Sequence, residues 1–177
     1  MPRLNLVDPS TTTGEARELF DGPLKGKHIN IFKHLGNSGA ALNGYVQLSG
    51  ALSKASLSAK ELEVVQLAVG QENACDYCLA AHTALGKGAG LSQDQTLGAR
   101  RGSIGDDPKL NAIARFAKAI HEKRGNVSDD DIEAFRGAGY DDGAIAEVVA
   151  SYALATFTNF FNHIAETDVD FPAAPAI

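Results

Sequence analysis

Helix-start signals recur along this chain and constrain its fold more than any other feature. Ser58 with Glu61, and Ser92 with Gln95, match the Ser-x-x-Glu/Gln capping box, in which each side chain binds the backbone N–H of the other residue. Asp107 is followed by proline at the first helical position, which is another common start. No segment alternates polar and apolar residues with the period of two that a half-buried strand requires. The sequence therefore predicts an all-α protein.

The predicted helices follow one another with no evident linker between them. They cover about residues 14–20, 30–35, 39–54, 59–69, 74–86, 93–101, 108–122, 129–136 and 142–165. Gly70 is expected to end the fourth helix, because glycine favours helix termination. Asn73 is expected to cap the fifth helix, because its side chain can accept a free backbone N–H.

We expect a single domain, because 177 residues are enough for one hydrophobic core and few for two. Its predicted parts are an irregular N-terminal arm at 1–29, a helical core at 30–165 and an extended tail at 166–177.

The charge and composition exclude several classes of protein. A formal net charge of −6 argues against nonspecific binding of nucleic acid or of an anionic membrane. The longest apolar stretch, 145–161, is interrupted by polar residues, and the N-terminus lacks the apolar region of a signal peptide. We therefore expect a cytoplasmic protein with no membrane or nucleic-acid partner. In that compartment a cysteine pair is more often redox-active, catalytic or metal-binding than a static disulfide.

The two cysteines, Cys75 and Cys78, are spaced Cys-x-x-Cys and are followed by His82. On a helix with about 100° per residue, the three side chains fall within an arc of roughly 60°. Cys75 is expected in the first turn, where free N–H groups and the helix dipole favour a thiolate. Cys78 and His82 are i,i+4 neighbours, so the imidazole can reach that sulfur directly or through a water. These residues alone leave open which cysteine is the nucleophile.

Other uses of a Cys-x-x-Cys pair fit the sequence less well. A thioredoxin-type site follows a strand, whereas a predicted helix precedes this pair. A c-type haem site needs histidine directly after the second cysteine, where this chain has Leu79. A structural zinc site needs four ligands, and the other histidines, at 28, 34, 121 and 163, are scattered. We therefore expect no metal and no bound cofactor; the simplest alternative is two buried cysteines that act as small apolar side chains.

Glu63 is the carboxylate that the sequence favours as a site residue. Glu61 belongs to the capping box, and Glu72 lies beside Asn73, where we expect it to be solvated. Glu63, by contrast, lies in a helix of otherwise apolar residues, where a carboxylate needs a polar partner. The next helix, which carries the cysteines, can supply that partner if the two helices pack as an antiparallel hairpin.

The remaining histidines receive structural interpretations. His28 and His34 are expected on the surface, and His121 in the charged last turn of its helix. Asn162 and His163, near the end of the longest helix, are ambiguous. His163 is a candidate to approach the site, from its own subunit or from a neighbouring one.

The stretch ELEVVQLAVGQENACDYCLAAH, residues 61–82, resembles the alkylhydroperoxidase D / carboxymuconolactone decarboxylase superfamily. Redox members of that superfamily carry the motif E-x11-C-x2-C-x3-H. The residues that match it are Glu63, Cys75, Cys78 and His82. The resemblance covers about residues 30–170 and implies a compact helical fold. It departs from the best-known hydroperoxidases at Tyr77, where those proteins have histidine.

The resemblance and the spacing of His82 together imply a thiol peroxidase in which Cys78 attacks a hydroperoxide. Cys75 then closes a disulfide with Cys78, and a dithiol reductant of the thioredoxin-like or lipoyl type reopens it. His82 takes the thiol proton, and Glu63 orients water or relays the proton. Two alternatives remain: a decarboxylase-like enzyme that uses His82 and Glu63 without sulfur chemistry, and a non-catalytic redox-sensing assembly protein.

The longest predicted helix, about residues 142–165, is apolar over most of its circumference. Such a helix is usually buried on all sides, and a chain of 177 residues offers limited material to surround it. We therefore expect a homo-oligomer with this helix in the interface. Phe157, Phe160 and Phe161 are expected in core or subunit contacts, and the resemblance implies trimers or hexamers.

Overall fold

The computed structural model describes residues 2–177; residue 1, the first of the predicted N-terminal arm, lies outside the described residues. Over the described residues the chain forms nine helices and no strand, which confirms the all-α prediction. They are α1 Gly14–Asp21, α2 Asn30–Leu35, α3 Gly39–Leu52, α4 Ala59–Glu72, α5 Asp76–Gly88, α6 Gln93–Arg101, α7 Pro108–Glu122, α8 Asp129–Gly137 and α9 Asp142–Ala165.

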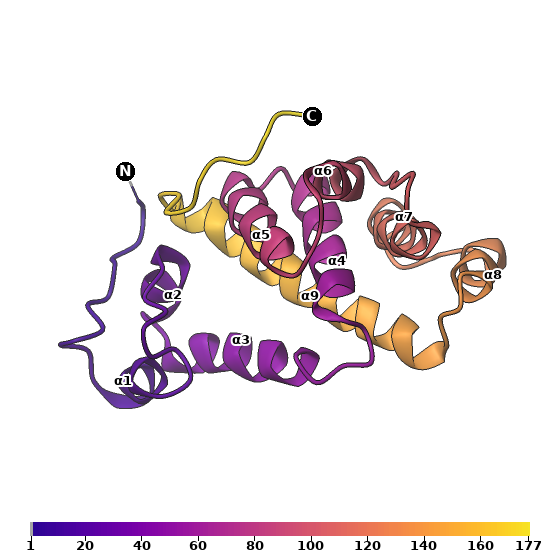
Figure 1. The fold of residues 1–177 in the computed structure, drawn as a ribbon. Helices are drawn as coiled ribbons and strands as arrows, with labels where there is room; N and C mark the ends of the chain where they lie inside the picture. Colours follow the sequence, from indigo (N-terminus) through magenta and orange to yellow (C-terminus); the bar gives the residue numbers. More distant parts are fainter. Residues whose placement is uncertain (1) are drawn as a thin grey trace.

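Helix α4 lies at the centre of the fold, in contact with α5, α6, α7 and α9 (Figure 1). Its fully buried side chains are Val64, Val65, Leu67, Ala68 and Val69. Because all seven consecutive residues 64–70 are buried, neighbours enclose this part of α4 on every side, and α4 is stable only when they do. Helices α1, α2 and α3 form a separate group that packs against α9.

The buried apolar side chains form two clusters that meet at α5. The larger cluster joins α4 to α6, α7, α8 and α9, and the smaller joins α1, α2 and α3 to the first turns of α5. Cys75, Tyr77 and Cys78 belong to the smaller cluster, whereas Leu79 belongs to the larger. The start of α5 therefore lies at the seam between the clusters, and the cysteines lie there with it.

Side-chain caps form at the helix starts that the sequence predicted. Both expected capping boxes close, at Ser58 and at Ser92, and a third forms at Ser128. Asp107 and Asp141 accept backbone N–H groups at the starts of α7 and α9. A cap of this kind contributes about 1 kcal/mol, so local chemistry determines where these helices begin.

The end of α4 differs from the prediction. The helix continues through Gly70 to Glu72, and the chain reverses later, at Ala74. A Cβ on Gly70 would lie 3.5 Å from a Leu79 methyl group and 3.8 Å from the Cβ of Cys78, so this residue packs directly against α5. Glu72 was expected to be solvated, but it is only partly exposed and pairs with Lys118 of α7 at 2.7 Å.

The start of α5 also differs from the prediction. Asn73 ends α4 instead of capping α5, and its side-chain amide donates to Asn159 on α9 at 2.9 Å. Ala74 has a left-handed backbone, with φ of 51°, which reverses the chain between the two helices. The N-cap of α5 is Cys75, so this cysteine precedes the first turn in which the sequence placed it.

The prediction of a surface position is wrong for His34, whose side chain is 1% exposed. The N-terminal arm folds back over α2, where the N–H of Val7 donates to the carbonyl of Lys33 at 3.1 Å. Nδ1 of His34 donates to the carbonyl of Asn5 in the same arm, at 3.3 Å. The arm has no periodic pattern, so its course over the helix could not be read from the sequence. His28 is exposed, as predicted.

Helix α9 extends along the molecule and contacts α2, α3, α4, α5 and α7 (Figure 1). Among residues 2–177 it is the one helix long and apolar enough to cross a membrane by length and composition alone, a test that core helices also pass. One side of α9 is buried in the core. The large apolar side chains on its exposed side are Val149, Phe157, Phe160 and Ile164. The sequence predicted that one chain could not surround α9, and within one chain this side of the helix is indeed exposed.

We expect a second copy of the chain to cover this exposed side of α9. Light scattering should then give a mass above the 18.6 kDa of a monomer. Phe160→Glu combined with Ile164→Glu should lower that mass, because burying a carboxylate in an apolar interface is unfavourable. Leu6→Glu, at a residue of the N-terminal arm that is 46% exposed, is the control and should leave the mass unchanged. A monomeric wild-type protein would contradict the prediction.

Candidate active site

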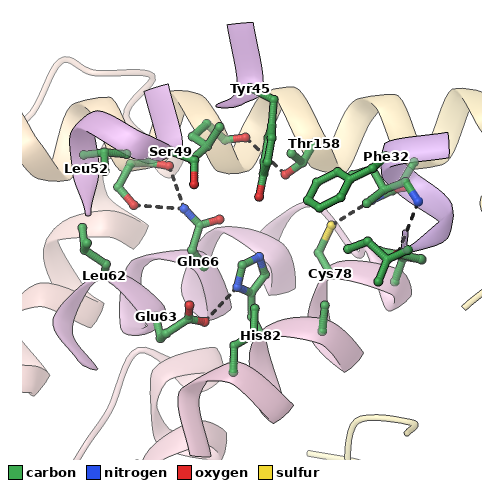
Figure 2. Close-up of a pocket in the computed structure, with 18 of the residues that line it drawn as sticks. Phe32, Tyr45, Ser49, Leu52, Leu62, Glu63, Gln66, Cys78, His82 and Thr158 are labelled. Atoms are coloured by element: carbon green, nitrogen blue, oxygen red, sulfur yellow. Dashed lines mark hydrogen bonds and ion pairs between the residues drawn. The ribbon is translucent and has the colours of Figure 1, made fainter. Parts of the chain in front are cut away.

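A cavity of about 280 Å³ lies between α3, α4, α5 and α9, and α2 and the C-terminal tail also line it (Figure 2). Its larger apolar and aromatic lining residues include Phe32, Tyr45, Leu62, Leu154 and Phe171. The polar side chains that reach it include Glu63 and Gln66 from α4, Cys78 and His82 from α5, and Thr158 and Asn162 from α9. A concave, mainly apolar space with a few converging polar groups is typical of a small-molecule site.

Three of the four predicted site residues, Glu63, Cys78 and His82, line this cavity. The fourth, Cys75, lies beside Cys78, and its sulfur accepts the backbone N–H of Cys78 at 3.3 Å. Both cysteines are free thiols, and they are 2% and 3% exposed. Cys78 is therefore the sulfur that a ligand in the cavity can reach.

The two thiols differ in acidity. A hydrogen bond from the Cys75 thiol lowers the pKa of Cys78 and outweighs the burial that would raise it. The side chains of Asn162, Asn159 and Thr158 on α9 lower the pKa of Cys78 further. The same thiol–thiol hydrogen bond, together with burial, raises the pKa of Cys75. The thiolate therefore forms on Cys78 while Cys75 keeps its proton, which is the opposite of what the helix-terminus argument favoured.

Glu63 and His82 form a hydrogen-bonded pair across the α4–α5 hairpin. Nδ1 of His82 donates to Oε2 of Glu63 at 2.8 Å, and the side chains are 20% and 18% exposed. Burial lowers the pKa of His82, but the charge of Glu63 and the hydrogen bond raise it more, so the net pKa is above its usual value. The helices approach closely at Gly86, where a Cβ would lie 2.9 Å from Leu91 and 3.6 Å from the Cβ of Glu63. Nε2 of His82 is left to face the cavity (Figure 2).

The sulfur of Cys78 has a different direct partner from the one expected. Within residues 2–177 the structure contains no direct hydrogen bond between His82 and Cys78. The donor is Asn162 of α9, whose Nδ2 lies 3.3 Å from the Cys78 sulfur and 4.0 Å from the Cys75 sulfur. The sequence left Asn162 ambiguous because 84 residues separate it from Cys78 and no spacing rule connects them.

The other histidines lie outside the cavity. His163, a candidate on the sequence, is exposed, and its Nε2 donates to the carbonyl of Asn73 at 2.8 Å. His121 lies in the last turn of α7 as predicted, with Nδ1 3.2 Å from the hydroxyl of Tyr152. Over the described part of the chain, no three His, Cys, Asp or Glu side chains group as metal ligands.

Gln66 is a cavity residue that the sequence did not indicate. It lies one turn after Glu63 and is 7% exposed. Its Nε2 donates to the backbone carbonyl of Ser151 at 3.1 Å and to the Ser151 hydroxyl at 3.0 Å. Both amide hydrogens are thereby used, and the carbonyl oxygen of Gln66 points into the cavity as an acceptor (Figure 2). The i,i+3 spacing from Glu63 was the one signal that could have identified it.

Tyr77 connects the cysteine helix to the C-terminal tail. Its hydroxyl donates to Oδ1 of Asp170 at 2.7 Å and accepts a longer bond from the N–H of Ile31 at 3.4 Å. The other oxygen of Asp170 accepts the N–H of Asn30 at 2.7 Å, and Phe171 packs edge-on against the Tyr77 ring at 5.8 Å. Burial and the bond to Asp170 raise the pKa of Tyr77, so the hydroxyl keeps its proton and donates a hydrogen bond to the carboxylate of the tail.

Residues 39–119 match the family model of the carboxymuconolactone decarboxylase family, and this segment carries all four predicted site residues. The fold matches the crystal structure of a peroxidase-related protein from Ralstonia eutropha JMP134, described as an alkylhydroperoxidase AhpD core. The TM-score is 0.84 at 18% sequence identity, over 96% of this chain and 92% of that one. The segment that carries the candidate site is therefore similar to the carboxymuconolactone decarboxylase family, and the whole chain has the fold of that alkylhydroperoxidase AhpD core.

Two further solved structures share this fold. A peroxidase-related protein from Silicibacter sp. TM1040 has a TM-score of 0.77 at 22% identity, over 94% of this chain and 89% of that one. A cysteine-to-alanine variant of the debrominase Bmp8, in complex with 2,3,4-tribromopyrrole, has a TM-score of 0.77 at 15% identity, over 96% of this chain and 94% of that one. No curated protein matches the chain.

Tyr77→Phe should destabilise the protein and loosen its tail. The change removes a partly buried hydrogen bond to a carboxylate, which is worth about 1–2 kcal/mol in the free energy of unfolding. Urea denaturation should show this loss, and limited proteolysis should cleave the tail faster. Tyr152→Phe, which removes a hydroxyl beside His121, is the matched control. Equal tail cleavage in the two variants would contradict the anchoring role of Tyr77.

Glu63→Gln should lower the pKa of His82, because it removes the negative charge that raises it. The folded pKa of His82 is above the unfolded value of 6.5, so the pair stabilises the protein fully below that pH. This contribution disappears as the pH rises through the folded pKa. The destabilisation by Glu63→Gln should therefore be larger at pH 6 than at pH 9.

Both effects of Glu63→Gln can be measured on the same sample. The imidazole resonances of His82 report its pKa by NMR, with exposed His28 as the internal reference. Denaturation curves at the two pH values report the stability difference. An equal loss of stability at both values would mean that the pair is not an ion pair in the folded protein.

Proposed function

We propose that this protein reduces hydroperoxides through the Cys75–Cys78 pair, assisted by His82 and Glu63. The observation that carries the proposal is the placement of the two sulfurs, since Cys78 lines the cavity and Cys75 lies directly beside it. Cys78, at the cavity, has a lowered pKa, and its neighbour Cys75 keeps its proton. A two-cysteine peroxidase needs this division, because one sulfur attacks as a thiolate and the other resolves the product.

In the first step the Cys78 thiolate attacks the terminal oxygen of the hydroperoxide. A sulfur–oxygen bond forms and the oxygen–oxygen bond breaks, which gives a sulfenic acid on Cys78 and an alkoxide. The alkoxide takes a proton from Nε2 of His82 and leaves as an alcohol. Glu63 stabilises the imidazolium that supplies this proton, since it accepts the hydrogen of Nδ1 at 2.8 Å.

In the second step the Cys75 sulfur attacks the Cys78 sulfur. The disulfide forms, the sulfur–oxygen bond breaks, and the proton of the Cys75 thiol passes to the leaving hydroxide, which departs as water. A dithiol then reduces the disulfide by exchange and is itself oxidised to a disulfide. We infer a thioredoxin-like or lipoyl dithiol as the reductant. The cycle requires no bound cofactor or metal.

The cavity lining supports a hydroperoxide with an organic substituent. Its volume is about 280 Å³, and its walls include the aromatic side chains of Phe32, Tyr45 and Phe171. Apolar walls favour an apolar substituent over water. The peroxidase-related descriptions of two structural relatives agree with peroxide as the oxidant.

We place the protein in the cytoplasm and infer a homotrimer or homohexamer.

The test is peroxide consumption by purified protein, with organic hydroperoxides and hydrogen peroxide as oxidants and a thioredoxin-like or lipoyl dithiol as reductant. Cys78→Ser should lower consumption at least a hundredfold, because the attacking sulfur is gone. Cys75→Ser should leave one turnover intact, so that a sulfenic acid accumulates on Cys78 and dimedone traps it. Lys87→Ala, at the exposed end of α5, is the control and should consume peroxide like the wild type.

Three outcomes would contradict the proposal. Dimedone on Cys75 in the Cys78→Ser variant, with rapid consumption, would reverse the roles of the cysteines. Proton-transfer or decarboxylase activity that survives Cys78→Ser but not His82→Ala would identify the enzyme that works without sulfur chemistry. Absence of all turnover, with a reversible disulfide, would indicate a redox sensor.

A further inference from the structure

We propose that Asn162 is a catalytic residue of this site, whose side-chain amide binds the Cys78 sulfur and selects Cys78 over Cys75 as the attacking cysteine. The inference rests on the proposed function, which it deepens by naming the group that activates the sulfur. It arises from a contact between α9 and α5 that the Cys-x-x-Cys motif does not contain.

The geometry favours one sulfur over the other. Nδ2 of Asn162 lies 3.3 Å from the sulfur of Cys78 and 4.0 Å from that of Cys75. An amide N–H donates and cannot accept, so the contact stabilises the anionic form of the nearer sulfur. The Cys75 thiol also donates to Cys78. Donors from α9 and from the start of α5 therefore converge on Cys78, whereas the sulfur of Cys75 accepts mainly the backbone N–H of Cys78.

The surroundings of Asn162 indicate that the role of its side-chain amide is to bind the sulfurs. Its side chain is 5% exposed, and the side-chain oxygen Oδ1 has no hydrogen-bond partner among residues 2–177. Burying an amide is unfavourable unless it gains strong partners. The partners that it has are the two sulfurs. A leucine of similar size would fill the same space without this penalty, so packing does not account for an asparagine at this position.

Neighbouring polar groups on α9, which also lower the pKa of Cys78, have further partners of their own. The hydroxyl of Thr158 donates within its own helix, to the carbonyls of Leu154 and Ala155. Asn159 accepts the side-chain amide of Asn73 at 2.9 Å, which ties α9 to the connection that precedes Cys75. This second contact holds α9 in place along its axis, so that Asn162 stays within reach of the thiols.

In this arrangement α5 supplies the proton donor, His82, and α9 supplies the group that binds the sulfur, Asn162. His82, which is bonded to Glu63, makes no direct hydrogen bond to Cys78 among the described residues, so its proton goes to the peroxide oxygen that leaves. Asn162 holds the sulfur during the same step. As the thiolate attacks, the sulfur–oxygen bond forms and the oxygen–oxygen bond breaks, and the amide itself gains and loses no proton.

The test uses the Cys75→Ser background, in which Cys78 is the one cysteine. The rate of alkylation by iodoacetamide is measured against pH, with and without Asn162→Leu. Loss of a hydrogen bond to a charged group should lower the acid dissociation constant of the Cys78 thiol about tenfold. The alkylation profile should therefore move to higher pH. The other titratable groups around Cys78 are Tyr45 on α3, Glu63 on α4, and Tyr77 and His82 on α5, and all are retained.

With both cysteines present, Asn162→Leu should consume peroxide more slowly at neutral pH and regain most of the rate at alkaline pH. Recovery is expected because solvent base then generates the thiolate that the amide no longer stabilises. A purely structural role would lower the rate at all pH values. Asn111→Leu is the matched control, since Asn111 binds the N–H of Ile104 at 2.9 Å, away from the cavity, and its loss should leave the profile unchanged.

A measurement on the wild-type protein covers the case in which Asn162→Leu does not fold. The side-chain N–H resonances of Asn162 should shift during a pH titration with the same midpoint as the alkylation of Cys78. An alkylation profile unchanged by Asn162→Leu, or N–H resonances that do not titrate, would overturn the proposal. Alkylation needs no peroxide, so this result stands apart from the peroxidase assay: either can fail while the other succeeds.

Discussion

The close packing of α4 against α5 is the constraint on which the candidate site depends. A Cβ on Gly70 of α4 would lie at van der Waals distance from Leu79 and Cys78 on α5, and a Cβ on Gly86 of α5 would lie 3.6 Å from the Cβ of Glu63 on α4. The short separation lets Glu63 on one helix bind an imidazole on the other at 2.8 Å. Without that contact a carboxylate would stand in an apolar helix with no partner, which is costly. The packing and the acid–base pair therefore require each other.

Helix α9 supplies the polar contacts that hold this hairpin in position. Buried polar residues at helical spacing on α9 each meet the hairpin, and the pairs are Ser151 with Gln66, Asn159 with Asn73, and Asn162 with Cys78. Buried polar groups are unfavourable unless they are satisfied, so these contacts fix both the rotation of α9 and its position along its axis. The buried face of the helix thus stabilises the core and also sets the acidity of a thiol. Its opposite, apolar face remains exposed in the single chain.

The two cysteines differ although they share one turn of chain. Cys75 is the N-cap, and its thiol donates a hydrogen bond to the sulfur of Cys78. This bond raises the pKa of Cys75 and lowers the pKa of Cys78. Position at a helix N-terminus would by itself favour a thiolate on Cys75. Direct hydrogen bonds outweigh this effect because they act at contact distance inside a site of low dielectric. The motif therefore yields an ordered pair rather than two equivalent thiols.

Local chemistry in the sequence determined the helices and part of the site. Caps such as Ser58 and Asp107 act over a few residues, so the sequence predicted where most helices begin. The spacing of Cys78 and His82, and the apolar surroundings of Glu63, likewise predicted a cluster on one hairpin, and the structure brings these side chains to one cavity.

Only the tertiary structure decided the remaining features. The contact of Asn162 with the thiols and the bond from Tyr77 to Asp170 join residues 84 and 93 positions apart. The burial of His34 depends on an arm without periodic pattern. Gly70 lies inside α4, where it packs against α5, although glycine by itself favours a helix end. Such contacts depend on how whole helices pack. That packing is determined by the simultaneous burial of surfaces from distant parts of the chain, which no short stretch of sequence encodes.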